Sequence, residues 1–307
     1  MFSLVLRLPP FTATGSDPRL PILPLKRFLQ LSIFVLPKNS DLLPHTPVFP
    51  PIGQPFIVLP SVDSTNNYAM AQARAGLAIH GTAYLAMEQT NGKGQRGKSW
   101  TSKPGENIML SVVLEPKVLT IGNQFILSAS VALACYDFLK KYTDPEMTRI
   151  KWPNDLYWQD RKAGGVLIES GVGSQESGLE RLESGVIGML RAIVGIGINV
   201  NQTVFDEQLR NPVSIKQITG KNWDIIELAK ELCDCLENRY SILIKKNPNK
   251  ILDEYNAVLY KLNEKVKLKK DNAVFETIIK AVTPEGRLLT KDTMERTFNF
   301  GEIEWII

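Results

Sequence analysis

The chain has 307 residues, of which 44% are hydrophobic and 22% charged, a composition typical of folded globular proteins. Its formal net charge of +4 is compatible with anionic ligands but too small to indicate nucleic-acid binding. The two histidines, His45 and His80, argue against a histidine-rich metal site or a Ser-His-Asp triad. The three cysteines show no metal-ligand spacing, which indicates a reducing, cytoplasmic setting.

The first 54 residues differ in composition from the rest of the chain. They hold more than half of the 19 prolines and few acidic residues. Prolines interrupt helices, so this segment cannot supply a DNA-binding helix-turn-helix module, and the broken apolar stretch 20–36 is a poor membrane span. It also lacks the ordered regions of a secretory signal. We expect a disordered extension, or upstream sequence that is not part of the working protein.

From residue 55 onward, apolar periodicity and turn residues predict regular elements. In chain order these are a strand at 56–59, a helix at 67–75, strands at 82–89 and 107–114, a helix at 125–142, a strand at 191–199, and helices at 223–243 and 251–262. Ser64 or Thr65 can cap the first helix. In the strand at 107–114, apolar residues alternate from Ile108 to Leu114. Segment 171–183 is rich in Gly, Ser and Glu and predicts a surface loop.

The last 45 residues predict a separate small structure. Short strands are expected at 266–268, 275–282, 288–290 and 296–298, separated by turn residues. This pattern predicts a small barrel after the main domain.

A hairpin in the middle of the chain carries the densest group of polar residues. The run Lys151-Trp152-Pro153-Asn154-Asp155 ends in a turn, residues 159–161 form a tip, and residues 165–169 read as a buried strand. Lys162 enters that strand beside glycines, which let a ligand approach the backbone. The alternative is an ordinary hairpin with a solvated lysine, the better interpretation for a lysine considered alone.

Three further stretches are candidate ligand sites. The loop Gly92-Lys93-Gly94-Gln95-Arg96-Gly97 combines exposed backbone N–H groups with two cations, which suits phosphates, although it fits neither a Walker nor a Rossmann motif. Trp100 follows it as an aromatic surface. Ser64-Thr65-Asn66 offers hydroxyls and an amide, or simply a helix cap. The strand Gly195 to Asn199 would let a ligand lie on its glycines, or is a bulged edge strand.

Taken together in chain order, the four stretches resemble the motifs of the biotin–protein ligases, and the resemblance covers roughly residues 54–307. The resemblance implies an α+β catalytic domain at 55–262, with a class II synthetase-like mixed sheet flanked by helices, and an SH3-like β-barrel at 263–307. It implies that biotin and ATP are joined into biotinyl-5′-AMP, and that biotin then passes to a lysine of a biotin carboxyl carrier domain.

The resemblance also implies roles for individual residues. Lys162, Asp155 and Arg96 would be catalytic, with Lys162 bridging the biotin carboxylate and the α-phosphate. Asp155 would hold Mg²⁺ and is a candidate base. The ligand-binding positions that match the family are Ser64, Thr65, Asn66, Gln89, Gly92, Lys93, Gly94, Gln95, Arg96, Trp100, Lys151, Asn154, Lys162, Gly165, Gly195, Gly197 and Asn199.

The sequence departs from the family's loop at two positions, and two other functions are compatible with it. Lys93 and Gln95 stand where the family loop commonly carries arginine, which puts retention of the adenylate in question. A lipoate–protein ligase would share the fold and the chemistry, and a biotin sensor would bind without catalysis. We expect a monomer or homodimer that binds neither nucleic acid nor membrane.

Overall fold

The computed structural model describes residues 50–116, 119, 124–170, 179–181, 187–189, 191–245 and 248–306. The expected extension at 1–54 therefore lies outside the described residues as far as residue 49. Ile52 is already buried in the core, and its backbone N–H donates to Glu237 on helix α4 (Ile225–Ile244). Among the described helices, none is long and apolar enough to cross a bilayer.

The main sheet has seven strands in the order β1-β2-β3-β9-β6-β5-β4. β1 runs parallel to β2 and all other neighbours are antiparallel, so the predicted mixed sheet is confirmed. The strands are β1 (Phe56–Leu59), β2 (Ala83–Ala86), β3 (Asn107–Leu114), β4 (Thr148–Lys151), β5 (Asp155–Trp158), β6 (Arg161–Ser170) and β9 (Ala192–Asn199).

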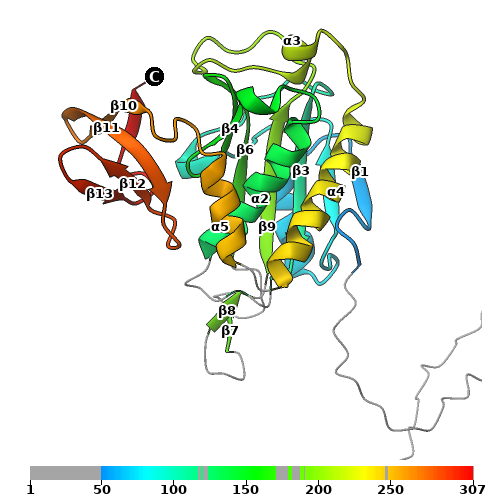
Figure 1. Cartoon of the computed structure of the whole chain (residues 1–307). Helices are drawn as coiled ribbons and strands as arrows, with labels where there is room; N and C mark the ends of the chain where they lie inside the picture. The colour runs from blue at the N-terminus through cyan, green and yellow to red at the C-terminus, as the bar shows by residue number, and fades with distance from the viewer. Residues whose placement is uncertain are drawn as a thin grey trace, which may run out of the picture. The chain divides into compact units, whose positions relative to one another are not determined.

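Helices pack on both faces of this sheet. α2 (Gln124–Leu139), α4 and α5 (Pro248–Ala257) pack together on one face, which is at the front in Figure 1. α1 (Thr65–Arg74) packs over β3 and β9 on the other face. β3 is consequently buried at all of its eight positions, including Ser111 between the alternating apolar residues.

The C-terminal residues form a second, antiparallel sheet of five strands, as predicted for this segment. Its order is β13-β12-β11-β10-β14, so the last strand returns to pair with the first. The strands are β10 (Lys265–Lys270), β11 (Ala273–Val282), β12 (Leu288–Lys291), β13 (Glu295–Phe298) and β14 (Glu304–Ile306). β14 was not predicted, because three residues are too short for a periodic signal.

Several element boundaries differ from the prediction. α1 begins at Thr65, and Ser64 occupies its N-cap position without the expected side-chain hydrogen bond. α5 ends at Ala257 rather than at 262, because the chain turns back to the sheet and brackets Ile150 of β4 with two backbone hydrogen bonds.

Short elements were also missed. The predicted loop at 171–183 contains β7 (Leu179–Arg181), which pairs with β8 (Ile187–Met189), while the rest of that loop lies outside the described residues. The helix α3 (Ile215–Thr219), the 3₁₀ turns η1 (Gln95–Gly97) and η3 (Pro145–Met147), and strand β5 complete the set.

Candidate active site

Lys162 lies on β6, where the strand pairing contains a bulge. The pairing with β5 skips Ala163, which is the extra residue between Lys162 and Gly164. Residues three apart in a regular strand face opposite sides of a sheet. The extra residue instead turns Lys162 to the side that Gly165 faces. The bulge therefore decides which face of the sheet receives the ammonium group.

The register of four strands places further predicted residues on that same face. Lys151 pairs with Asp155, and Asp155 pairs with Gly165. Gly165 in turn pairs with Gly197 on β9. Directly paired residues project to the same side. These four residues therefore form one row across the sheet beside Lys162.

Lys162 and Asp155 form an ion pair on this face. Lys162 Nζ lies 2.7 Å from Asp155 Oδ1, and the two side chains are 34% and 32% exposed. A Cβ atom on Gly165 would lie 3.0 Å from that carboxylate oxygen and 3.5 Å from Lys162 Nζ. A glycine here thus leaves space for a ligand beside the two charges.

Two predicted amides hold this strand in place. Asn199 is buried and donates to the backbone oxygens of Lys162 (3.3 Å) and Val213 (3.2 Å). Asn154 is also buried and donates to Val166 O. Both amide groups already serve the protein backbone, and their predicted contacts with nucleotide or metal stay predictions.

Lys151 has an aromatic environment. Its Nζ lies 4.8 Å from the centre of the Tyr157 ring and 5.3 Å from that of Trp305, and it donates to the Tyr157 hydroxyl (3.2 Å). Burial lowers the pKa of Lys151 to about 8, an effect that neighbouring Asp155 partly opposes. This lysine can therefore change charge near neutral pH.

The glycine-rich loop folds back on itself and contacts two parts of the protein. Its ends meet through Trp100 N–H and Gly92 O (2.9 Å), and Gly94 N–H donates to Lys98 O (2.6 Å). On one side Lys93 Nζ lies 3.7 Å from Glu169 Oε1, and Gln95 Nε2 donates to the backbone of β6 at 3.2 Å.

On its other side the loop reaches the C-terminal sheet. Arg96 Nη1 donates to Gly301 O at 2.9 Å. The predicted catalytic Arg96 thus points to the C-terminal residues rather than to the Lys162–Asp155 pair, and its catalytic role stays a prediction.

The two glycines of β9 make room for side chains of the protein. A Cβ on Gly197 would lie 2.6 Å from the Trp100 ring, and a Cβ on Gly195 would overlap the Asn66 amide. The expectation that a ligand lies directly on both glycines therefore needs correction, because Trp100 and Asn66 occupy these positions. Within the described part of the chain, the buried Trp100 Nε1 has no hydrogen-bond partner.

A polar network continues the site toward α1. Gln89 Oε1 accepts from the backbone N–H (2.7 Å) and the hydroxyl (3.0 Å) of Thr65. The Asn66 amide donates to Glu169 Oε2 at 2.7 Å. Ser111 joins the two halves, with its Oγ 2.7 Å from Thr65 Oγ1 and 2.6 Å from Asn66 Oδ1.

This network has more acceptors than donors. Its three oxygen–oxygen contacts involve two amide oxygens, which only accept, and two hydroxyls, which bring one hydrogen each. One contact must therefore lack a hydrogen. The cluster consequently favours a ligand that brings N–H or O–H donors.

Sequence reasoning missed Ser111 and Glu169 as site residues. A single hydroxyl inside the apolar run Ile108 to Leu114 of strand β3 was a signal for the first. Glu169 ends the polar hairpin stretch, but only its partners Asn66 and Lys93, far away in sequence, distinguish it from a surface acid.

The carboxylates of the site limit how a divalent metal could bind there. No group of three or more His, Cys, Asp or Glu side chains able to hold a metal occurs among the described residues. Mg²⁺ commonly uses one or two protein carboxylates and completes its shell with waters and substrate phosphates. Asp155 fits that requirement only when a nucleotide supplies phosphates beside it.

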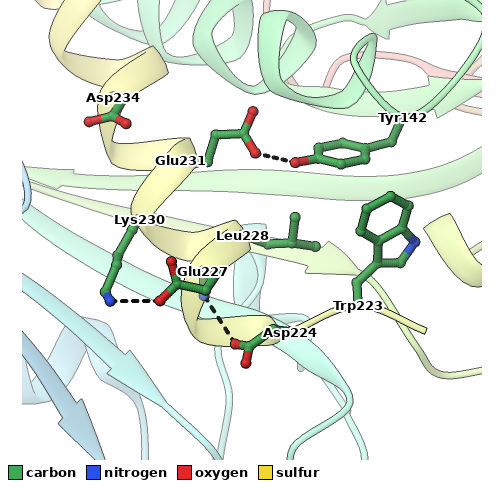
Figure 2. Close-up of a pocket in the computed structure, with 8 residues that line it drawn as sticks. All are labelled: Tyr142, Trp223, Asp224, Glu227, Leu228, Lys230, Glu231 and Asp234. Atoms are coloured by element: carbon green, nitrogen blue, oxygen red, sulfur yellow. Dashed lines mark hydrogen bonds and ion pairs between the residues drawn. The ribbon is translucent and has the colours of Figure 1, made fainter. Parts of the chain in front are cut away.

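A separate surface pocket of about 410 Å³ lies where α4 begins (Figure 2). Its lining residues are Tyr142, Trp223, Asp224, Glu227, Leu228, Lys230, Glu231 and Asp234. None of the predicted site residues lines it, and its four acidic side chains against one lysine do not suit an anionic nucleotide.

Known proteins share much of this sequence and fold. A model of the biotin/lipoate A/B protein ligase family matches residues 58–180. The chain is 30% identical over 240 residues to the biotin–[acetyl-CoA-carboxylase] ligase of Paracoccus denitrificans, covering 76% of this chain and 93% of that protein. It is 29% identical over 256 residues to the bifunctional ligase/repressor BirA of Escherichia coli (strain K12), covering 82% and 74%.

A solved structure shares both fold and sequence. Biotin protein ligase from Aquifex aeolicus, in complex with biotin and ATP, superposes with a TM-score of 0.64 and 26% identity, covering 81% of this chain and 97% of that one. Fold and site together define a ligase of the biotin and lipoate attachment class. Within that class, the chain belongs to the biotin protein ligases, and its function is that of a biotin protein ligase.

Proposed function

We propose that this chain is an ATP-dependent, AMP-forming ligase that acts in the cytoplasm. It would attach biotin to one lysine of a biotin carboxyl carrier domain of a biotin-dependent carboxylase. The observation that carries the proposal is the Lys162–Asp155 ion pair beside Gly165, on the face that also carries the polar network.

The polar network is the proposed binding site for the ring system of biotin. The ureido ring has two N–H donors and one carbonyl acceptor. Its N–H groups match the surplus of acceptors around Gln89, Thr65 and Ser111. The buried positions of Thr65 and Ser111 strengthen such hydrogen bonds by excluding water. Ser64, also buried, lies next to this network in the chain.

In the first step, a biotin carboxylate oxygen attacks the α-phosphorus of ATP, and the bond to the departing pyrophosphate breaks. Two anionic groups must meet, so a fixed cation lowers the barrier. We assign that role to Lys162, whose ammonium would exchange Asp155 for the carboxylate and the α-phosphate. Mg²⁺, when bound by Asp155 and the phosphates, supplies further neutralisation.

The nucleotide end of the site is assigned to residues near Gly197. Trp100 offers a ring face and a buried indole N–H that no described residue accepts, which suits a purine. Lys151 adds positive charge in the same row of the sheet. The loop from Gly92 to Gly97 would cover the adenylate and exclude water, which limits wasteful hydrolysis.

In the second step, the carrier lysine amine attacks the acyl carbon of biotinyl-5′-AMP, and AMP leaves. The amine forms an amide and loses a proton, for which Asp155 is the proposed acceptor. Asp155 lies 2.7 Å from Lys162 and is also the proposed Mg²⁺ ligand of the first step. One carboxylate would therefore serve both steps. A monomer or homodimer would carry out this reaction without nucleic acid.

The experiment uses the full chain, biotin, ATP, Mg²⁺ and a biotin carboxyl carrier domain, followed by intact-mass spectrometry of the carrier. We expect a gain of one biotinyl group that requires ATP and the acceptor lysine. Parallel incubation with lipoate and a lipoyl carrier domain tests the rival class. Modification of the lipoyl domain, with none of the biotin carrier, would contradict the proposal.

A further inference from the structure

Glu169 lies on the same face of β6 as Gly165 and contacts Asn66, a residue of the polar network. Residues two apart in a strand share a face, so Gly165, Leu167 and Glu169 project to one side of the sheet. The Asn66 amide donates from Nδ2 to Glu169 Oε2 at 2.7 Å and, more weakly, to Leu167 O at 3.4 Å. Asn66 is 3% exposed and fills the space that a Cβ atom on Gly195 would need, so its position is closely fixed.

The contact with Glu169 decides which end of the Asn66 amide faces Ser111. A carboxylate only accepts hydrogen bonds, so Glu169 pairs with the NH₂ group of Asn66 and not with its oxygen. The amide oxygen therefore faces Ser111, whose Oγ lies 2.6 Å from it. Glu169 thus makes Asn66 an acceptor toward the rest of the network.

The other end of the network is fixed as an acceptor by the backbone. Gln89 Oε1 accepts from the backbone N–H of Thr65 at 2.7 Å, and because an N–H only donates, Gln89 presents its oxygen to the Thr65 hydroxyl as well. Two amide oxygens therefore bracket the hydroxyls of Thr65 and Ser111. Because both ends accept, the three contacts share two hydrogens, and the network is short of one.

An amide in place of this carboxylate would remove the shortage. In Glu169→Gln the new NH₂ group can donate to Asn66 Oδ1, which allows the Asn66 amide to turn over. Asn66 would then donate to Ser111, and each of the three contacts would have its own hydrogen. The turn gives up only the 3.4 Å contact with Leu167 O and completes contacts of 2.6 to 3.0 Å. We therefore expect the turned amide to be the more stable arrangement.

We propose that Glu169 is the positioning residue that sets the hydrogen-bond polarity of the network and thereby selects a ligand with N–H donors. It acts through Asn66 and Ser111 rather than through a contact of its own with the ligand. The inference rests on the proposed function, because it takes the ureido ring of biotin as the ligand of the network. The second contact of Glu169, from Oε1 to Lys93 Nζ at 3.7 Å, joins partly exposed groups and contributes little stability.

The first test compares Glu169→Gln with Glu227→Gln by calorimetric titration with biotin in the absence of ATP. Both changes remove one carboxylate from an ion pair with a lysine, but Glu227 lies on α4, on the opposite face of the sheet. Glu169→Gln should weaken biotin binding by about tenfold, because one buried hydrogen bond to the ligand is lost. Glu227→Gln should bind biotin like the unmodified enzyme. In Glu169→Gln the KM for biotin should rise while kcat changes little, because Lys162 and Asp155 are untouched.

A swapped pair separates this role from packing and from the contact with Lys93. Asn66→Asp/Glu169→Gln exchanges the amide and the carboxylate while it keeps their sizes and the net charge. The new carboxylate again presents an oxygen to Ser111, so biotin affinity should return to within about threefold of that of the unmodified enzyme. The swap does not restore the charge beside Lys93, so an affinity that stays as low as in Glu169→Gln would overturn the inference. Its outcome decides the question even where Glu169→Gln alone folds poorly.

A third measurement reads the donors of the ligand directly. Carbamate analogues of biotin carry a ring oxygen in place of one ureido N–H. The unmodified enzyme should bind at least one of the two analogues about tenfold more weakly than biotin, and Glu169→Gln should lose most of that discrimination. Equal discrimination by both enzymes, or unchanged biotin affinity in Glu169→Gln, would overturn the inference. An unmodified enzyme that neither binds biotin nor forms biotinyl-5′-AMP would instead overturn the proposed function.

Discussion

Lys151 and Lys162 share one face of the sheet but differ in their surroundings. Lys162 pairs with Asp155 at 2.7 Å and stays about one-third exposed. Such a pair contributes little stability, so its role is better explained by ligand binding. Lys151 packs against Tyr157 and Trp305 instead.

The first prediction concerns Lys151. Burial lowers the pKa of this lysine to about 8. It is mostly charged at pH 7 and mostly neutral at pH 9, so attraction for ATP should weaken as pH rises through 8. We expect kcat/KM for ATP to fall between pH 7 and 9. Lys151→Arg stays charged throughout and should flatten the fall. Identical pH profiles for the two enzymes would disprove the assignment.

The orientation of Lys162 could not be predicted from sequence. Its glycine neighbours and the preceding turn singled out the stretch as a candidate site. Its side of the sheet, however, depends on the bulge at Ala163, which exists only once β5 and β6 pair. Ser111 likewise joins the site only because β3 packs against α1, where its hydroxyl contacts Thr65 and Asn66.

At the scale of elements, strand β9 shows what the spacing of its glycines could and could not predict. Gly195 and Gly197 share the site face, as their two-residue spacing predicts. Sequence could not show that Asn66 and Trp100, from distant segments, fill the space above them. The glycines accept protein side chains, which then contact the ligand in the proposed site.

The second prediction compares Gly195→Ala with Gly197→Ala. At Gly195 a methyl group meets the buried Asn66, so we expect weaker biotin binding and a stability loss of about 1–3 kcal/mol. At Gly197 it meets Trp100, which follows the glycine-rich loop, so ATP binding should weaken while biotin binding persists. Calorimetric titration with each ligand and thermal melts measure both. Equal losses of biotin affinity would contradict the division of the site.

Element types were predicted better than element ends. The strand Phe56–Leu59 and the strand Asn107–Leu114 match in full, because turn residues bound them. The predicted C-terminal end of α5 was wrong, because backbone hydrogen bonds to Ile150 of β4 compete with continuation of the helix. Tertiary pairing of this kind has no local sequence signal.

At the scale of the molecule, the two sheets contact different groups of the candidate site residues. The seven-stranded sheet carries the proposed biotin end and the Lys162–Asp155 pair on one face. The five-stranded C-terminal sheet contacts Arg96 and Trp152 through Phe300, Gly301 and Gly286. Sequence predicted a small β structure after the main domain, but gave no sign that its turns reach the site.

The most direct test of the account is biotin-dependent exchange of pyrophosphate into ATP by Lys162→Ala. The variant should lose the cation that lets two anions meet, so we expect the exchange rate to fall by about 100-fold or more. Lys221→Ala, which removes an exposed lysine, serves as the control. The melting temperature should be unchanged, because Lys162 supplies charge rather than packing. Exchange at the unmodified rate in a folded Lys162→Ala enzyme would contradict the account.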